Sequence, residues 1–153
     1  MKFIAAFVAL VAASVVSAQS PAFTNCAAAP QMTVTGFSVA PYPLCINKNV
    51  CATVVGTSTT PIDGDATLAI AGRYLGRLVY SDSKDLCPLL AASGHPCPVP
   101  ITTTSVTACI LVKPSAPPNI GVALTITATN GDGGIIFCQS ATVTASNDPT
   151  ICP

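Results

Sequence analysis

The chain consists of short segments rich in Thr, Val and Ile that are separated by turn residues, which is typical of β-strands. In the clearest segment, Ile120, Val122, Leu124 and Ile126 alternate with small or polar residues, so one face of the strand is apolar. The run Asn130-Gly131-Asp132-Gly133-Gly134 predicts a hairpin turn directly after it. We expect strands over residues 32–39, 49–57, 66–72, 73–81, 103–113, 120–129 and 134–145.

Strands of this length and spacing predict an all-β fold, an immunoglobulin-like β-sandwich of about seven antiparallel strands. A helical turn is expected only over residues 86–93, because no longer segment has a 3.6-residue period. A bulge at Gly72 or Gly76 could shift the pairing of the two central strands. No repeat or linker divides the chain, so we expect residues 19–153 to form one domain.

Residues 1–18 have the pattern of a secretory signal peptide. Lys2 precedes an apolar run over residues 3–16, and Val16-Ser17-Ala18 provides the small residues at which signal peptidase cleaves. The run is too short to span the roughly 30 Å core of a bilayer. We therefore expect a mature chain that begins at Gln19 and is either secreted or delivered to the vacuolar lumen.

Eight cysteines follow this leader, and an even number in an oxidising compartment predicts a disulfide framework. No two of them have the Cys-x-x-Cys spacing of a zinc site, so we expect no metal. Their spacing alone does not select one set of pairs, although bridges over 45–51 and 87–97 would close short loops. The eight are Cys26, Cys45, Cys51, Cys87, Cys97, Cys109, Cys138 and Cys152.

Charge and catalytic residues argue against several classes of function. Six Lys and Arg balance six Asp, so the chain lacks the basic surface of a nucleic-acid-binding protein. The single histidine, His95, has no Gly-x-Ser-x-Gly motif to accompany it, so an exposed loop residue is favoured over a hydrolase. Every acidic residue is an Asp in turn-like sequence, which fits local hydrogen bonding better than glycosidase or calcium chemistry. We expect neither enzymatic activity nor a cofactor.

The apolar strand faces leave two alternatives open. They could pack into an ordinary closed core, or they could line a cavity for a lipid tail or sterol if the sheets part slightly. The periodicity of the sequence does not distinguish between these arrangements.

Two motifs resemble those of a known family. They are Tyr74-Leu75-Gly76-Arg77-Leu78-Val79-Tyr80-Ser81-Asp82-Ser83-Lys84-Asp85-Leu86-Cys87 and, after it, Cys97-Pro98-Val99. Together they resemble the ML lipid-recognition domain family, with the closest likeness to fungal phosphatidylglycerol/phosphatidylinositol transfer proteins. The same family includes Niemann–Pick-type sterol carriers. Further matching elements, in the same order, are Pro41-Tyr42-Pro43, Ile62-Asp63-Gly64, Pro117-Pro118 and Asp132-Gly133.

The resemblance implies a sandwich with a lipid cavity between its sheets. Carried over by position, it pairs Cys87 with Cys97, Cys45 with Cys51, and Cys26 with Cys138. Cys109 and Cys152 then pair by exclusion.

The resemblance also implies reversible binding of a phospholipid or sterol, with transient membrane contact. We expect a monomer with Tyr74 and Tyr80 near the cavity mouth. Arg73, Arg77 or Lys113 could contact an anionic headgroup, although solvated outer-face positions are favoured for all of them. An extracellular recognition protein that acts through its surface without lipid is the alternative function. The expected lipid-binding residues are Leu68, Ile70, Tyr74, Leu78, Tyr80, Ile110, Val112, Ile120, Val122, Leu124 and Ile126.

Overall fold

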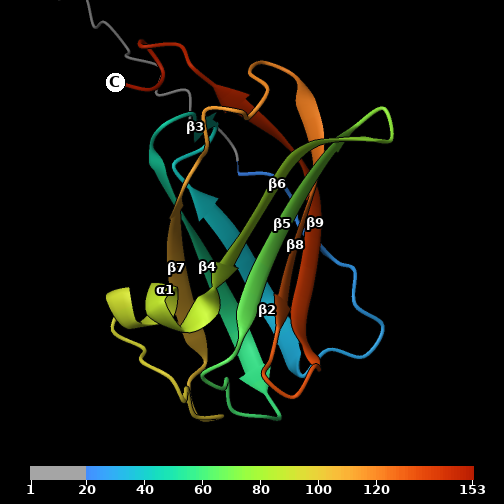
Figure 1. Cartoon of the computed structure of the whole chain (residues 1–153), viewed down its shortest axis with the longest axis vertical. Helices are drawn as coiled ribbons and strands as arrows, with labels where there is room; N and C mark the ends of the chain where they lie inside the picture. Colours follow the sequence, from blue (N-terminus) through green and yellow to red (C-terminus); the bar gives the residue numbers. More distant parts are fainter. Residues whose placement is uncertain (1–19) are drawn as a thin grey trace, which may run out of the picture.

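The structure, a computed structural model, describes residues 20–153. The expected signal peptide and its cleavage site therefore lie outside the described residues. The chain forms two β-sheets packed face to face (Figure 1), which confirms the predicted β-sandwich. Within residues 20–153, no helix is long and apolar enough to cross a bilayer.

The larger sheet has six strands. Five of them lie in the order β1 (Thr24–Asn25), β9 (Ile135–Ser146), β8 (Gly121–Thr129), β5 (Thr67–Tyr74) and β6 (Arg77–Asp85). The sixth, β3 (Leu44–Cys45), pairs in parallel with β9 and lies off this path. All other neighbouring pairs in this sheet are antiparallel.

The smaller sheet has three antiparallel strands, in the order β2 (Met32–Ala40), β4 (Asn49–Ser58) and β7 (Ser105–Leu111). Helix α1 (Leu86–Ala92) connects β6 to β7 at the end of the sandwich opposite β3 (Figure 1). The seven strands expected from the sequence correspond to β2 and to β4 through β9. Strands β1 and β3 were not expected, because two residues are too few to show an alternation.

The alternation of apolar residues produces the two layers. On β8, Val122, Leu124 and Ile126 are buried against the other sheet, whereas Ala123 is exposed. Directly paired residues share a face, so Ile126 lies beside Ile70 of β5 on the inner face. The inner faces of both sheets therefore consist almost entirely of hydrocarbon.

Local irregularities appear at the predicted glycines. A bulge between Gly72 and Arg73 interrupts the β5–β6 pairing, so Arg73 lies opposite Leu78. The hairpin between β8 and β9 turns at the Asn-Gly-Asp-Gly-Gly run, where Gly133 has a φ of +84° and Asn130 accepts and donates backbone hydrogen bonds. The sequence signals for the turn and the bulge are both confirmed.

Two of the four disulfides have the expected pairing and two do not. Cys26 is bonded to Cys138 and Cys87 to Cys97, as the resemblance implied. The expected pairs Cys45–Cys51 and Cys109–Cys152 are wrong: the structure contains Cys51–Cys109 and Cys45–Cys152. Cys51 lies within β4, opposite Cys109 on β7, and Cys45 on β3 lies beside β9, from which the C-terminal tail continues.

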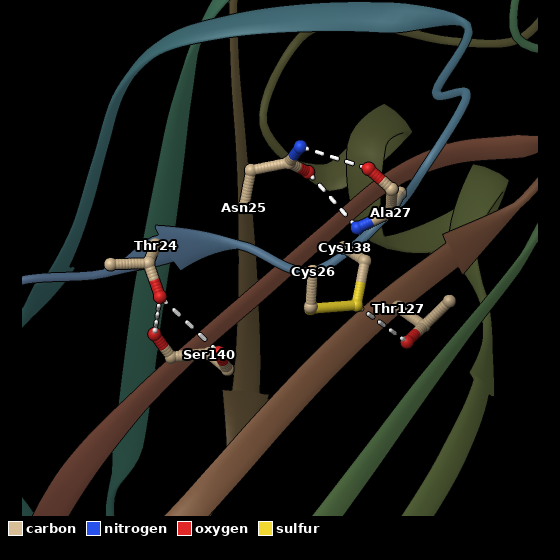
Figure 2. Close-up of a disulfide and its surroundings, with 7 residues drawn as sticks. All are labelled: Thr24, Asn25, Cys26, Ala27, Thr127, Cys138 and Ser140. Atoms are coloured by element: carbon tan, nitrogen blue, oxygen red, sulfur yellow. Dashed lines mark hydrogen bonds between the residues drawn. A yellow bond between two sulfur atoms is a disulfide. The ribbon is translucent and has the colours of Figure 1, made fainter.

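The bridges within the sheets lie on outer faces. Cys26–Cys138 attaches β1 to β9 beside Thr127, and Thr24 and Ser140 extend the contact through hydroxyl groups 3.4 Å apart (Figure 2). Cys51 and Cys109 alternate with the inward-facing Ala52 and Ala108, so their bridge also faces outward. These disulfides reinforce each sheet without occupying the space between the sheets.

Candidate functional site: an apolar cavity between the sheets

A cavity of about 90 Å³ lies between the two sheets. Its walls come from both inner faces, from α1 and from the loop that follows β7. Tyr80 is the one residue among the described lining side chains that carries a polar group. The lining residues are Phe37, Val39, Leu44, Val50, Ala52, Val54, Ile62, Leu68, Ile70, Tyr80, Leu86, Leu90, Val106, Ala108, Ile110, Val112, Ala116, Pro117, Val122, Leu124, Ile126, Phe137, Val143 and Ala145.

The structure places most of the expected lipid-binding residues in this wall. They come from both sheets and from the residue that follows β7. The members in the wall are Leu68, Ile70, Tyr80, Ile110, Val112, Val122, Leu124 and Ile126.

Three expected residues, Tyr74, Leu78 and Ile120, do not line the cavity. Tyr74 and Leu78 are 39% and 55% exposed. The β5–β6 hairpin extends beyond the smaller sheet (Figure 1). In addition, the bulge pairs Leu78 with Arg73, whose other partner is the exposed Ala123, so Leu78 is on the outer face. Ile120 precedes β8 and is partly buried outside the cavity wall. Strand parity placed Leu78 on the same face as Tyr80, but the bulge reverses that parity, and parity does not show where the opposing sheet ends.

Many residues of the smaller sheet that line the cavity were not expected from the sequence. Val50, Ala52 and Val54 alternate along β4, a signal that could have identified this wall. Ala52 and Ala108 are direct cross-strand partners, and both face the cavity. Their methyl groups leave space in the middle of the wall that larger side chains would fill.

One edge of the sandwich is closed by aromatic side chains. Phe37 of β2 has its ring centroid 4.6 Å from that of Phe23 and 6.0 Å from that of Phe137 of β9. Phe23 precedes β1 and Phe137 is on β9, and both strands belong to the larger sheet. The three rings therefore join the two layers by tilted aromatic packing. We call these three residues the phenylalanine cluster.

The opposite edge, where β6 lies near the end of β7, is closed by polar contacts. Lys113 extends from the smaller sheet, and its Nζ lies 2.6 Å from Oδ1 of Asp82 on β6. The same ammonium donates a hydrogen bond of 3.1 Å to the carbonyl of Ser81. The backbone N–H of Lys113 donates a long hydrogen bond of 3.5 Å to the hydroxyl of Tyr80. We call this side of the molecule the β6/β7 edge and the ion pair the Lys113–Asp82 bridge.

Asp82 is unusual because its side chain is only 2% exposed. Its Oδ2 has no hydrogen-bond partner within the part of the chain that the structure describes. Burial raises the pKa of Asp82, but the hydrogen bond and positive charge of Lys113 outweigh burial and hold that pKa below its usual value. Burial also raises the pKa of Tyr80, so its hydroxyl stays protonated at neutral pH.

The other candidate headgroup residues lie elsewhere. Arg73 and Arg77 are exposed near the β5–β6 turn, as expected of solvated charges. Lys113, by contrast, is not a solvated outer-face charge, since it forms the bridge to Asp82. Between the arginines, Leu75 is 86% exposed with a φ of +49°, so an apolar side chain protrudes at the tip of the hairpin.

Residues with catalytic potential are scattered. His95 is half-buried in the segment after α1, and its backbone N–H donates to the carbonyl of Leu90 at 2.9 Å. Among residues 20–153, no group of three or more His, Cys, Asp or Glu side chains is placed to hold a metal ion. The cavity is therefore the feature of the fold that points to a function.

Solved structures with the same fold share little sequence with this chain. A Niemann-Pick type C2 protein from Japanese carpenter ant has a TM-score of 0.63 and 12% identity, covering 82% of this chain and 99% of its own. The C-terminal domain of Wzt has a TM-score of 0.54 and 11% identity, covering 84% and 79%. Chicken MD-1, complexed with lipid IVa, has a TM-score of 0.50 and 16% identity, covering 80% and 86%.

Comparisons of sequence identify a family for this chain. No curated protein sequence matches the chain significantly. A family model described as ML domain matches residues 20–145, which is most of the chain and includes all nine strands except the last residue of β9. The chain therefore belongs to the ML domain family.

Proposed function

We propose that this protein is a secreted carrier that holds the apolar part of a phospholipid or sterol between its two sheets. The observation that carries the proposal is the cavity wall, in which Tyr80 supplies the sole polar group among the described lining residues. A hydrocarbon ligand would bury almost no polar group of this wall. Each methylene group that it buries contributes about 0.8 kcal/mol of favourable binding free energy. Chicken MD-1, a protein of similar fold, forms a complex with lipid IVa.

Uptake of a lipid requires the sheets to move apart. The cavity of about 90 Å³ is smaller than the roughly 150 Å³ apolar cavity that holds a benzene molecule. Ligand pockets for whole small molecules begin at about 300 Å³. The proposed mechanism is therefore reversible sequestration, in which the inner faces separate around the ligand and no covalent bond changes.

Transient membrane contact is part of the proposal, and the β5–β6 hairpin is the suggested site. Leu75 at its tip is exposed, with Tyr74 and Leu78 as partly exposed apolar neighbours. Arg73 and Arg77 add positive charge next to this apolar tip. An apolar side chain beside basic residues suits the interface of an anionic bilayer.

Enlarging the small side chains of the cavity wall tests the proposal directly. In the Ala52→Leu/Ala108→Leu variant, branched side chains would fill the space between the sheets, so we expect bound lipid to be lost. Ala69→Leu is the matched control, because Ala69 lies on the exposed outer face of β5. Native mass spectrometry and lipid extraction of each secreted, disulfide-intact protein provide the measurement.

A stoichiometric phospholipid or sterol in wild type and Ala69→Leu, but not in the double variant, would support the carrier function. Wild-type protein that stays without lipid after incubation with mixed phosphatidylglycerol, phosphatidylinositol and ergosterol vesicles would refute it. That outcome would favour a recognition protein that acts through its surface. Equal lipid content in all three folded proteins would instead show that the ligand binds outside this cavity.

A further inference from the structure

The two edges of the sandwich are closed by different means. The phenylalanine cluster joins the layers along one edge through packed rings. At one end, β3 lies in the segment that joins β2 to β4 of the smaller sheet and pairs with β9 of the larger sheet, and the Cys45–Cys152 disulfide reinforces this contact. At the other end, α1 and the segment closed by Cys87–Cys97 connect β6 with β7. These three sides are held by aromatic packing, strand pairing or covalent connection.

The remaining side is the β6/β7 edge beyond α1, and no disulfide of the described chain crosses it. Lys113 supplies the polar contacts there, through its Nζ to Asp82 and Ser81 and through its N–H to Tyr80. Two of these partners flank the cavity, because Tyr80 is part of its wall and Asp82 is the cross-strand partner of the lining residue Ile70.

We propose that the Lys113–Asp82 bridge is the closure that must open when lipid enters or leaves, so that this pair controls the rate of lipid exchange. The inference rests on the proposed carrier function for its ligand, but the closure itself is a property of the protein alone. Asp82 lies on the β6 side of this edge and Lys113 lies on the β7 side. Any separation of β6 from the end of β7 must therefore lengthen the 2.6 Å contact between them.

The unequal burial of the two partners favours the closed form of this edge. Breaking the bridge would leave the Asp82 carboxylate, which is 2% exposed, without its main counter-charge. A buried charge that loses its partner is strongly destabilised, so the closed form is favoured until water or ligand can reach the carboxylate. Lys113 is 40% exposed and can transfer its ammonium to water at little cost. Opening is therefore opposed mainly by Asp82.

Lys84 provides a matched control. Its Nζ lies 3.7 Å from the same Oδ1 of Asp82, but Lys84 and Asp82 are on the same strand. Lys84→Met therefore removes a positive charge from the same carboxylate without removing a contact across the edge. The test variant is Asp82→Asn/Lys113→Met, which neutralises both partners, keeps their approximate size and leaves no buried charge unpaired.

The first measurement is lipid release. Each protein is loaded with acyl-labelled fluorescent phosphatidylglycerol or with dehydroergosterol, whichever wild type binds, and is then mixed with unlabelled phosphatidylcholine vesicles. We expect release from the double variant to be about tenfold faster than from wild type, which corresponds to ~1.4 kcal/mol in the barrier. Release from Lys84→Met should remain close to wild type. Equal rates for wild type and the double variant would overturn the proposal.

The second measurement needs no lipid and keeps the two proposals separable. Amide hydrogen exchange should be faster in β6 and β7 of the double variant than in wild type, while β8 and β9 remain unchanged. If wild type binds neither probe, the carrier function fails and hydrogen exchange alone decides whether the bridge closes this edge. Unchanged exchange in β6 and β7 would overturn the closure. Circular dichroism and thermal unfolding establish that each variant is folded.

Discussion

Cys51 of β4 lies directly opposite Cys109 of β7, and the disulfide between them joins neighbouring strands on the outer face of the smaller sheet. Ala52, which follows Cys51, and Ala108, which precedes Cys109, face inward and line the cavity. The covalent bond therefore holds two adjacent strands of one wall together without restricting the distance between the walls.

Replacing this pair, as Cys51→Ala/Cys109→Ala, should lower the free energy of unfolding by about 2–4 kcal/mol, because the unfolded chain loses a cross-link. Lipid content should stay at the wild-type level, since the bridge does not face the cavity. Chemical denaturation and native mass spectrometry measure the two quantities. A folded variant that has lost its lipid would contradict the outward-facing role of this bridge.

Asn130 connects three turns at one end of the sandwich. Its Nδ2 donates to Oε1 of Gln31 at 2.9 Å and to the carbonyl of Pro61 at 2.8 Å, and its Oδ1 accepts the N–H of Asp63 at 2.8 Å. The residue is 3% exposed. The side chain therefore holds the loops before β2, between β4 and β5, and between β8 and β9 in a fixed arrangement.

Asn130→Asp should destabilise the protein by about 1–3 kcal/mol or more, because a carboxylate cannot donate to two acceptors and would be buried beside them. Urea unfolding at neutral pH provides the measurement. Asn147→Asp, at an exposed position, is the control and should leave stability nearly unchanged. Equal stability of both variants would show that the buried amide does not hold the loops.

Leu75→Asp should slow lipid transfer to anionic vesicles without changing how much lipid the protein holds. The substitution places a negative charge at the tip that is proposed to enter the bilayer, while the cavity wall is unaffected. Ile101→Asp is the control, since Ile101 is 50% exposed but lies outside this hairpin. Transfer rates to phosphatidylglycerol and phosphatidylcholine vesicles give the comparison, and equal slowing by both variants would contradict the assignment of the hairpin.

The stabilising effect of the Lys113–Asp82 bridge should depend on pH in a defined direction. The net pKa of Asp82 is lowered in the folded protein: burial raises it, but Lys113 outweighs that effect. A carboxyl group of this kind stabilises the fold above its unfolded pKa of about 3.9, and its contribution disappears as the pH falls through the folded value. The contribution should therefore be constant from about pH 5 to pH 8.

The measurement is the difference in unfolding free energy between wild type and Asp82→Asn/Lys113→Met as a function of pH. We expect a constant difference at neutral and mildly acidic pH, followed by a change below about pH 4. The charged groups that face Asp82 are Lys84 and Lys113, and the lowered pKa of the Asp82 carboxyl group sets the pH range of the expected change. A change centred near pH 6 would contradict this assignment.

The fold was predictable because its signals are local. The alternation from Val122 to Ile126 specifies one inner face, and the Asn130–Gly134 turn joins β8 to β9, so strand positions follow from neighbouring residues alone. Family membership followed from a motif that is continuous in sequence. Eight of the 24 residues that line the cavity could therefore be assigned from the sequence, most of them on the larger sheet.

The features that could not be predicted depend on contacts between distant segments. Cys51 and Cys109 are 58 residues apart, and only the β4–β7 register brings them together. Tyr74 and Leu78 have the same parity in the sequence, but the bulge after Gly72 pairs Leu78 with Arg73 and so places Leu78 on the outer face. The pairing of Lys113 with Asp82 likewise requires the β7 end to meet β6, which no periodicity along either segment indicates.

The phenylalanine cluster determines the geometry with which the sheets can separate. If the Lys113–Asp82 bridge opens as proposed, the β6/β7 edge would separate more than the edge held by the rings, so the gap would taper toward the rings. In the proposed carrier, such a gap would orient the lipid, with its bulkiest and most polar part near Lys113 and its hydrocarbon terminus near Phe37. A photoreactive group on the terminal carbon of a bound acyl chain should accordingly label β2 and β9 rather than β6.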